Sequence, residues 1–295
     1  MKKLSNKTKG IICILFSALC FSGMSSFINL SGELPIAQKV FFRNLVAFFI
    51  AAGALFKNHE GFKPIKGALP FHFIRSAVGL LGVFGNFYAT THMAHTADAA
   101  MLNKLSPFFT LLFSAIFLKE KVKPKQALAI LGAFIGSMFV IKPTLSNVEL
   151  VPSIAGLIGG IAAGAAYTCV RHLGNIGENS RFTVFQFSAF SIAVTLPFML
   201  FDFKPMTAKQ LVFLLLVGVC AAGGQFGITA AYTYAPSREI SVYDYSNIIF
   251  VAIEGYLFLG HQIPDILSIV GYVIISLMAI WMFVYNNKET KLKKQ

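Results

Sequence analysis

The sequence is poor in charged residues. Asp, Glu, Lys and Arg make up 13% of the 295 residues, which is about half the share of a typical soluble domain. Hydrophobic residues make up 56%, and 31 residues are phenylalanine. A water-soluble fold of this length would leave much of that apolar surface exposed to water. The composition therefore excludes an ordinary soluble protein and indicates an integral membrane protein.

The sequence also lacks the motifs of common enzymes. Cys13, Cys20, Cys169 and Cys220 all lie within apolar segments and do not have the spacing of metal ligands. No nucleophile–base pair, phosphate-binding loop or nucleotide-binding motif is present, which excludes ATP-driven transport. We therefore expect no enzymatic activity, no cofactor and no metal.

Long apolar runs are what the chain has in abundance. Runs of about 18–25 residues are long enough to cross a bilayer as helices. The sequence predicts an all-α polytopic membrane protein. Its ten transmembrane helices are expected at 10–30, 34–56, 69–91, 97–118, 124–142, 153–171, 182–201, 210–232, 238–259 and 264–285.

The basic residues predict the orientation of the chain. Of the 25 Lys and Arg, only Lys39, Lys142, Lys204 and Lys209 fall on the side opposite the termini. By the positive-inside rule, both termini are expected in the cytoplasm of a protein of the cytoplasmic membrane. We also expect Arg75 and Arg238 to flank the cytoplasmic mouth and to serve topology; the alternative is that they bind the substrate. The net charge of +13 then reflects orientation and anionic lipid headgroups, not nucleic-acid binding.

The second half of the chain repeats the first. Residues 1–148 form a first five-helix repeat, and residues 149–295 form a second one. Because five is an odd number, the second copy is expected to insert upside down relative to the first. Inverted repeats with a binding site near the membrane midplane are typical of secondary transporters.

The fourth predicted helix of each half begins with the same local pattern. Adding 141 to the numbers of Thr96 and Asp98 gives Ser237 and Glu239, a hydroxyl residue followed by an acid two positions later. A hydroxyl side chain caps free amides at a helix start, and an acid there faces the positive end of the helix dipole. We therefore predict capping roles for these residues.

Several short motifs resemble those of one transporter family. They are Phe42-Arg43-Asn44-Leu45-Val46-Ala47 in the second predicted helix, Leu105-Ser106-Pro107 with Glu120 in and after the fourth, and Gly132 in the fifth. Together they resemble the signatures of the EamA-type family of the drug/metabolite transporter superfamily. The resemblance implies an inner-membrane carrier for small organic solutes. It also implies a central cavity lined by the first, third and fourth helices of each half.

The second copy departs from this pattern at two positions. Ile248 stands where the proline is usual, and His261 stands where the glutamate is usual. What the family shows at these two positions is therefore not carried over to this chain.

Helical periodicity places polar residues along the predicted cavity. Asn103, Ser106, Thr110 and Ser114 recur at steps of three, four and four, which makes one polar stripe on an apolar helix. The alternative is that such residues only hydrogen-bond to neighbouring helices. The predicted substrate-binding and cavity residues are Asn86, Asn103, Lys104, Ser106, Thr110, Tyr167, Gln225, Tyr232, Asp244 and Asn247.

Three ionisable residues lie deep in the predicted helices, where charge is costly. For Arg43 we expect a structural role, bonded to neighbouring carbonyl groups; the alternative is contact with the substrate. Lys104 either reaches outward to the interface or faces the cavity as a counter-charge. Glu254 is the proton-coupling candidate, because burial favours the protonated form of a carboxyl and water entry favours the charged form. Its alternative role is to bind a substrate amine.

We predict a secondary active transporter that works by alternating access. Its substrate would be a small polar or amphipathic organic metabolite, such as an amino acid, an amine or a nucleoside-like compound. Asp244 and Glu254 against the single Lys104 favour a substrate with an amino group. The expected partners are this substrate and membrane lipid, and the chain is expected as a monomer or a weak homodimer.

The alternative function is a membrane-embedded enzyme that acts on lipid or isoprenoid headgroups. Such an enzyme would need acids or histidines clustered at one interface, with a metal in most cases. His92, His95 and Asp98 are the one candidate cluster. They span the junction of two predicted helices, which favours capping over metal binding.

Overall fold

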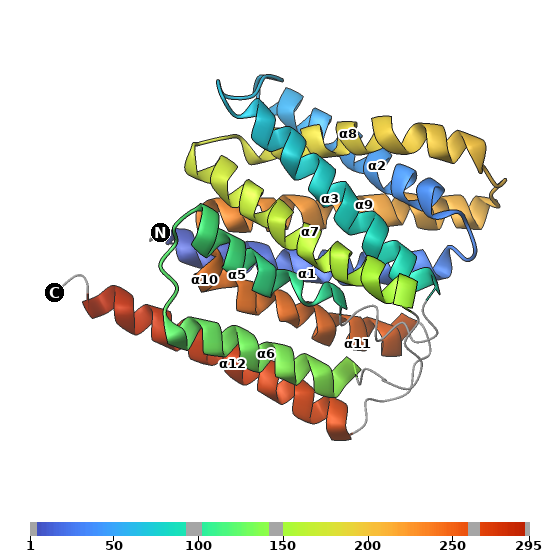
Figure 1. Ribbon diagram of the computed structural model, residues 1–295. Helices are drawn as coiled ribbons and strands as arrows, with labels where there is room; N and C mark the ends of the chain where they lie inside the picture. The colour runs from blue at the N-terminus through green and yellow to red at the C-terminus, as the bar shows by residue number, and fades with distance from the viewer. Residues whose placement is uncertain (1–4, 93–101, 142–149, 259–265, 293–295) are drawn as a thin grey trace.

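The computed structural model describes residues 5–92, 102–141, 150–258 and 266–292, and the regular structure in this part of the chain is all helical. The first half contains α1 (Asn6–Leu30), α2 (Ile36–Lys57), α3 (Leu69–His92), α5 (Ser106–Phe117) and α6 (Pro124–Ile141). The second half contains α7 (Leu150–Asn175), α8 (Ser180–Phe201), α9 (Ala208–Tyr234), α10 (Ser237–Ile240), the 3-10 helix η1 (Ser241–Tyr245), α11 (Ser246–Phe258) and α12 (Ile266–Leu292). The helices form one elongated bundle (Figure 1).

The bundle is suited to a bilayer. Among the described helices, α1, α2, α7, α8 and α9 are long and apolar enough to cross a membrane. Large apolar side chains such as Phe49, Phe56, Leu200 and Ile280 are exposed on the outside of the bundle. Such helices are stable in the hydrocarbon core of a bilayer, because their surfaces are apolar and their backbone groups are hydrogen-bonded internally. The chain is an all-helical, multi-pass membrane protein.

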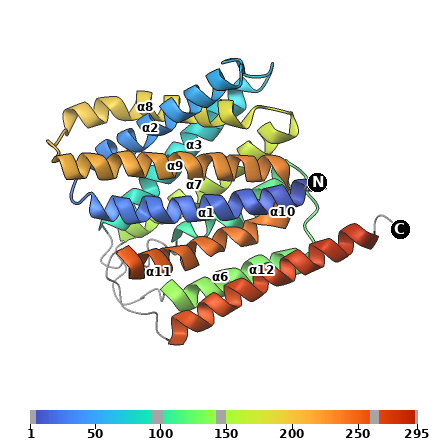
Figure 2. The same cartoon turned by 180° about the vertical axis from the view of Figure 1, so that it is seen from behind.

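The helices pack mainly across the two halves of the chain. Helix α1 lies along α9, α3 along α7, α2 along α8, and α6 along α12. The last of these pairs lies at one edge of the bundle in both views (Figures 1 and 2). Helices α5 and α11 lie on α7 and α1, respectively. The core of the molecule is therefore built from both halves together.

Glycines allow the closest of these contacts. A Cβ atom on Gly85 of α3 would lie 2.5 Å from the carbonyl oxygen of Ala155 in α7, and one on Gly159 would lie 2.9 Å from the amide nitrogen of Asn86. Gly132, the motif glycine of α6, similarly leaves room for Met278 of α12. Small residues at such positions let helix backbones touch within a membrane.

The fourth segment of each half is interrupted, so the prediction of continuous helices at 97–118 and 238–259 is wrong. In the first half the chain turns at Lys104 and Leu105 before α5 begins. In the second half it passes through α10, η1 and α11. Pro107 has no N–H group, and the N–H of Phe108 bonds to Leu105 instead of Lys104. The freed Lys104 carbonyl accepts a hydrogen bond from the Tyr245 hydroxyl at 3.0 Å.

The capping prediction for Ser237 is also wrong. The residue that caps α10 is Pro236, which makes no side-chain capping bond. The Ser237 hydroxyl instead lies 2.8 Å from the Ser114 hydroxyl of α5. Thr96 and Asp98, for which the same role is predicted, lie outside the described residues.

Candidate functional site

A cavity of about 130 Å³ lies inside the bundle, between the two halves. Of the predicted site residues, it is lined by Asn86, Asn103, Lys104, Ser106, Tyr167, Gln225, Asp244 and Asn247. Thr110 and Tyr232 lie beside it. The Thr110 hydroxyl donates to the Ser106 carbonyl at 2.8 Å, and the Tyr232 ring stacks on that of Tyr167 with centroids 5.4 Å apart. The two interrupted segments thus bring their polar side chains to one space.

One part of the cavity wall joins the two interruptions. The Lys104 ammonium donates to Asn247 Oδ1 at 2.8 Å, and Asn247 Nδ2 donates to the Ala18 carbonyl of α1 at 2.9 Å. Asp244 is close enough to attract Lys104 electrostatically. Lys104 is buried and faces the cavity, so it does not reach outward to the membrane interface.

Another part of the wall is formed by Arg75. This side chain is only 2% exposed, so the expectation that it lies at a helix end and serves topology is wrong. Its guanidinium carbon lies 3.8 Å from the centre of the Phe187 ring, and its Nη2 donates to Gln225 Oε1 at 2.9 Å. Its Nε and Nη1 have no hydrogen-bond partner within the described ranges. Arg75 is a cavity residue that sequence reasoning missed.

Arg43 lines the same cavity. Its contacts are the Met24 sulfur at 3.4 Å from Nε and Asn44 Oδ1 at 3.5 Å from Nη1. The predicted bonds to neighbouring carbonyl groups are not among its hydrogen bonds to the residues that the structure describes. Arg43 and Phe187 are the eighth residues of the 22-residue helices α2 and α8. The second helix of each half therefore contributes to the cavity, in addition to the first, third and fourth.

Glu254 does not line the cavity. It follows Asn247 by seven residues on the same face of α11, but α1 covers that face beyond the cavity. Its carboxylate accepts hydrogen bonds from Ser22 at 2.7 Å and Ser26 at 3.1 Å. Periodicity placed Glu254 on the correct face, but it gave no sign of the helix that covers this face.

The charge balance of the cavity therefore differs from the predicted one. Its described lining contains three cationic side chains, Arg43, Arg75 and Lys104, and one carboxylate, Asp244. From the sequence, Glu254 was expected in the cavity and the two arginines were not. The premise that two acids face a single lysine in the cavity is therefore wrong, and the argument from it to a substrate with an amino group loses its support.

Of the three residues of the candidate metal cluster, the structure describes only His92. The His92 ring stacks on Tyr88, and its Nδ1 lies 3.0 Å from the Tyr88 carbonyl oxygen. His95 and Asp98 lie outside the described residues, as does His261. Within the described residues, no group of three His, Cys, Asp or Glu side chains is placed to hold a metal ion.

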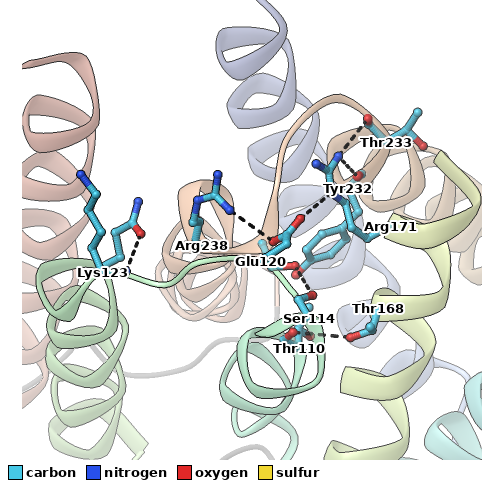
Figure 3. Close-up of polar contacts among 11 residues, drawn as sticks. Thr110, Ser114, Glu120, Lys123, Thr168, Arg171, Tyr232, Thr233 and Arg238 are labelled. Atoms are coloured by element: carbon cyan, nitrogen blue, oxygen red, sulfur yellow. Dashed lines mark hydrogen bonds and ion pairs between the residues drawn. The ribbon is translucent and has the colours of Figure 1, made fainter. Parts of the chain in front are cut away.

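A second polar cluster, which we call the Glu120 network, lies at the end of the bundle where α1 begins and α12 ends (Figures 1 and 3). Glu120, just after α5, accepts a hydrogen bond from Arg171 Nε of α7 at 2.9 Å. Arg171 Nη1 also donates to the carbonyls of Tyr232 at 3.1 Å and Thr233 at 3.3 Å in α9. Arg238 of α10 lies 4.0 Å from the second Glu120 oxygen. The network connects elements of both halves.

Two further contacts lie between this network and the cavity. They are the Ser114–Ser237 hydroxyl pair and a bond of 3.4 Å from the Thr168 hydroxyl to the Thr110 carbonyl (Figure 3). In the sequence, Glu120 stands out only as part of the family motif, and no pattern marks Arg171 as its partner. A lone arginine near the end of an apolar run looks the same as a topological charge.

Comparisons with known proteins agree with this architecture. Residues 8–142 match the EamA-like transporter family. The chain is 30% identical to the pseudopaline exporter CntI of Pseudomonas aeruginosa, over 92% of this chain and 94% of that protein. It is 25% identical to a riboflavin transporter of Vibrio cholerae, over 76% of this chain and 74% of that protein.

A solved structure has the same fold. The alignment has a TM-score of 0.82 at 14% identity, and it covers 95% of this chain and 98% of the other. The family match and the relatives show a membrane transporter rather than an enzyme. The chain therefore belongs to the EamA-like transporter family of the drug/metabolite transporter superfamily.

Proposed function

We propose that this chain is a secondary active transporter that moves a small polar organic metabolite across the cytoplasmic membrane by alternating access. The observation that carries the proposal is the charged cavity between the two halves, at the level where both fourth segments are interrupted. Broken helices at a central site are a common feature of secondary transporters. The cavity residues named above are then the substrate contacts.

The packing of the bundle supports two inverted repeats at 1–148 and 149–295. If the first helix of one half corresponds to the first helix of the other, the contact of α1 with α9 corresponds to that of α7 with α3. In the same way, α1 with α11 corresponds to α7 with α5, and α2–α8 and α6–α12 each correspond to themselves. A pseudo-two-fold relation between inverted halves provides two states of similar energy, one open to each side.

The Glu120 network is the proposed gate on the cytoplasmic side. Its ion pairs and hydrogen bonds join α5, α7, α9 and α10 at the end of the bundle where α1 begins and α12 ends. That end also carries most of the basic residues, which supports a cytoplasmic location for both termini. Opening to the cytoplasm then requires Glu120 and Arg171 to separate, and the cavity would open on the opposite side while they are joined.

Alternating access can be tested with one cysteine in the cavity. The four native cysteines are replaced by alanine, Ser106→Cys is added, and a membrane-impermeant thiol reagent is applied to inside-out and right-side-out vesicles. We expect modification from both sides. Glu120→Gln should raise the rate from the cytoplasmic side, whereas Glu60→Gln, which alters an ion pair with the partly exposed Arg181, should not. Modification from one side only, in all variants, would contradict the proposal.

A further inference from the structure

Arg75 is a buried cation whose charge is not compensated by the described residues. Its partners are the neutral Gln225 amide and the face of the Phe187 ring, and two of its nitrogens have no hydrogen bond within the described part of the chain. An unpaired charge is costly inside a membrane protein. Such a group is retained where a ligand of opposite charge arrives.

The neighbouring charges make the uncompensated charge of Arg75 still less favourable. Arg43 is close enough to Arg75 for the two guanidinium groups to repel each other. Asp244 attracts Lys104, and no carboxylate is among the groups that act on Arg75 within the described ranges. The Tyr167 hydroxyl is within electrostatic reach of both arginines and of Asp244. Arg43 and Arg75 thus form a pair of neighbouring cations in the cavity, whereas Lys104 has the acid Asp244 near it.

The surroundings of Arg75 hold its guanidinium in one orientation. The guanidinium packs over the face of the Phe187 ring, and its Nη2 donates to the Gln225 oxygen, so both contacts restrict its orientation. Gly79 makes room for the stack, because a Cβ there would lie 3.2 Å from the Phe187 ring and 3.4 Å from Arg75 Nη1. A planar, fixed guanidinium suits the planar geometry of a carboxylate. A carboxylate also carries a single negative charge, so its desolvation in the cavity costs less free energy than that of a doubly charged phosphate.

We propose that Arg75, together with Arg43, binds a carboxylate of the transported solute, so that the substrates are organic acids or amino acids with more carboxylates than amino groups. This inference rests on the proposed transport function, and it names the substrate class of the same cavity. Asp244 is left to accept a hydrogen bond from an amino or hydroxyl group of that solute.

The test measures protection of a cavity cysteine. The full-length protein carries Ser106→Cys in a background without native cysteines, and its reaction with a neutral, water-soluble maleimide is timed in detergent. Malonate should slow the reaction, and the uncharged malonamide should not. Arg75→Gln should weaken the apparent malonate affinity about tenfold or more, because charge-assisted hydrogen bonds are lost. Arg181→Gln, which removes a partly exposed cation outside the cavity lining, should have no effect.

The other outcomes overturn the inference, and each shows which part of it is wrong. Equal malonate protection in the parent and in Arg75→Gln removes the role of Arg75, and stronger protection by inorganic phosphate than by malonate assigns a different substrate class. A reactive cysteine that malonate leaves unprotected refutes the carboxylate site while transport stands. An unreactive cysteine refutes the cavity itself, and with it the proposed function. Should Arg75→Gln fail to fold, Arg75→Lys keeps the charge without the planar fork and should show partial loss.

Discussion

The Lys104 ammonium and the Asn247 side-chain oxygen are joined by a hydrogen bond of 2.8 Å, and they come from the interrupted segments of opposite halves. Lys104→Met would leave that oxygen without its donor and Asp244 without its cation. We expect a loss of about 1–3 kcal/mol in stability, seen as a lower melting temperature, together with reduced transport. Lys104→Arg keeps the charge and should retain part of both. An unchanged melting temperature in Lys104→Met would show that the bond contributes little.

The structure predicts which residues of the two fourth segments are accessible to water. Cysteines at Ser106 and Asn247, which line the cavity, should react with a water-soluble thiol reagent. Cysteines at Leu112, on the outer surface of α5, and at the fully buried Thr110 should be protected. A reactive Thr110→Cys would mean that water reaches further along α5 than this state of the protein shows.

Glu254 allows a test of proton coupling. Glu254→Gln keeps an acceptor for Ser22 and Ser26 but does not titrate. If the carboxylate couples transport to protons, the variant should lose gradient-driven accumulation and keep substrate exchange in proteoliposomes. Glu254→Leu, which leaves both hydroxyls without this acceptor, should also lower the melting temperature. Wild-type accumulation by the Gln variant would assign Glu254 to helix packing alone.

Gly159 can be compared with a glycine that touches nothing. A Cβ on Gly159 would meet the backbone of α3, whereas one on Gly53 in α2 has no atom within 4 Å. We expect Gly159→Ala to destabilise the protein by about 1–3 kcal/mol through overpacking. Gly53→Ala should be neutral or stabilising, because alanine favours the helix more than glycine does. Equal melting temperatures for the two variants would show that α3 and α7 separate easily.

The sequence predicted the helical membrane fold, because apolar runs of this length are typical of membrane-spanning helices. It also predicted most of the polar side chains that line the cavity, since polar residues such as Asn103 and Ser106 stand out on apolar helices. The position of Arg75 could not be predicted, because a cation near a helix end looks the same whether it faces lipid headgroups or a cavity. The neighbours of Glu254 were hidden for a similar reason, because periodicity gives the face of a helix but not what covers it.

The bond from the Tyr245 hydroxyl to the Lys104 carbonyl has a consequence for the ancestry of the fold. Under the proposed repeat, Tyr245 corresponds to Lys104, because it stands 141 positions later in the sequence. Lysine has no hydroxyl group, and the Lys104 ammonium donates to Asn247 in this structure. Two copies of residues 1–148 would therefore not reproduce this joint. If the halves arose by duplication, they have since become complementary at this contact.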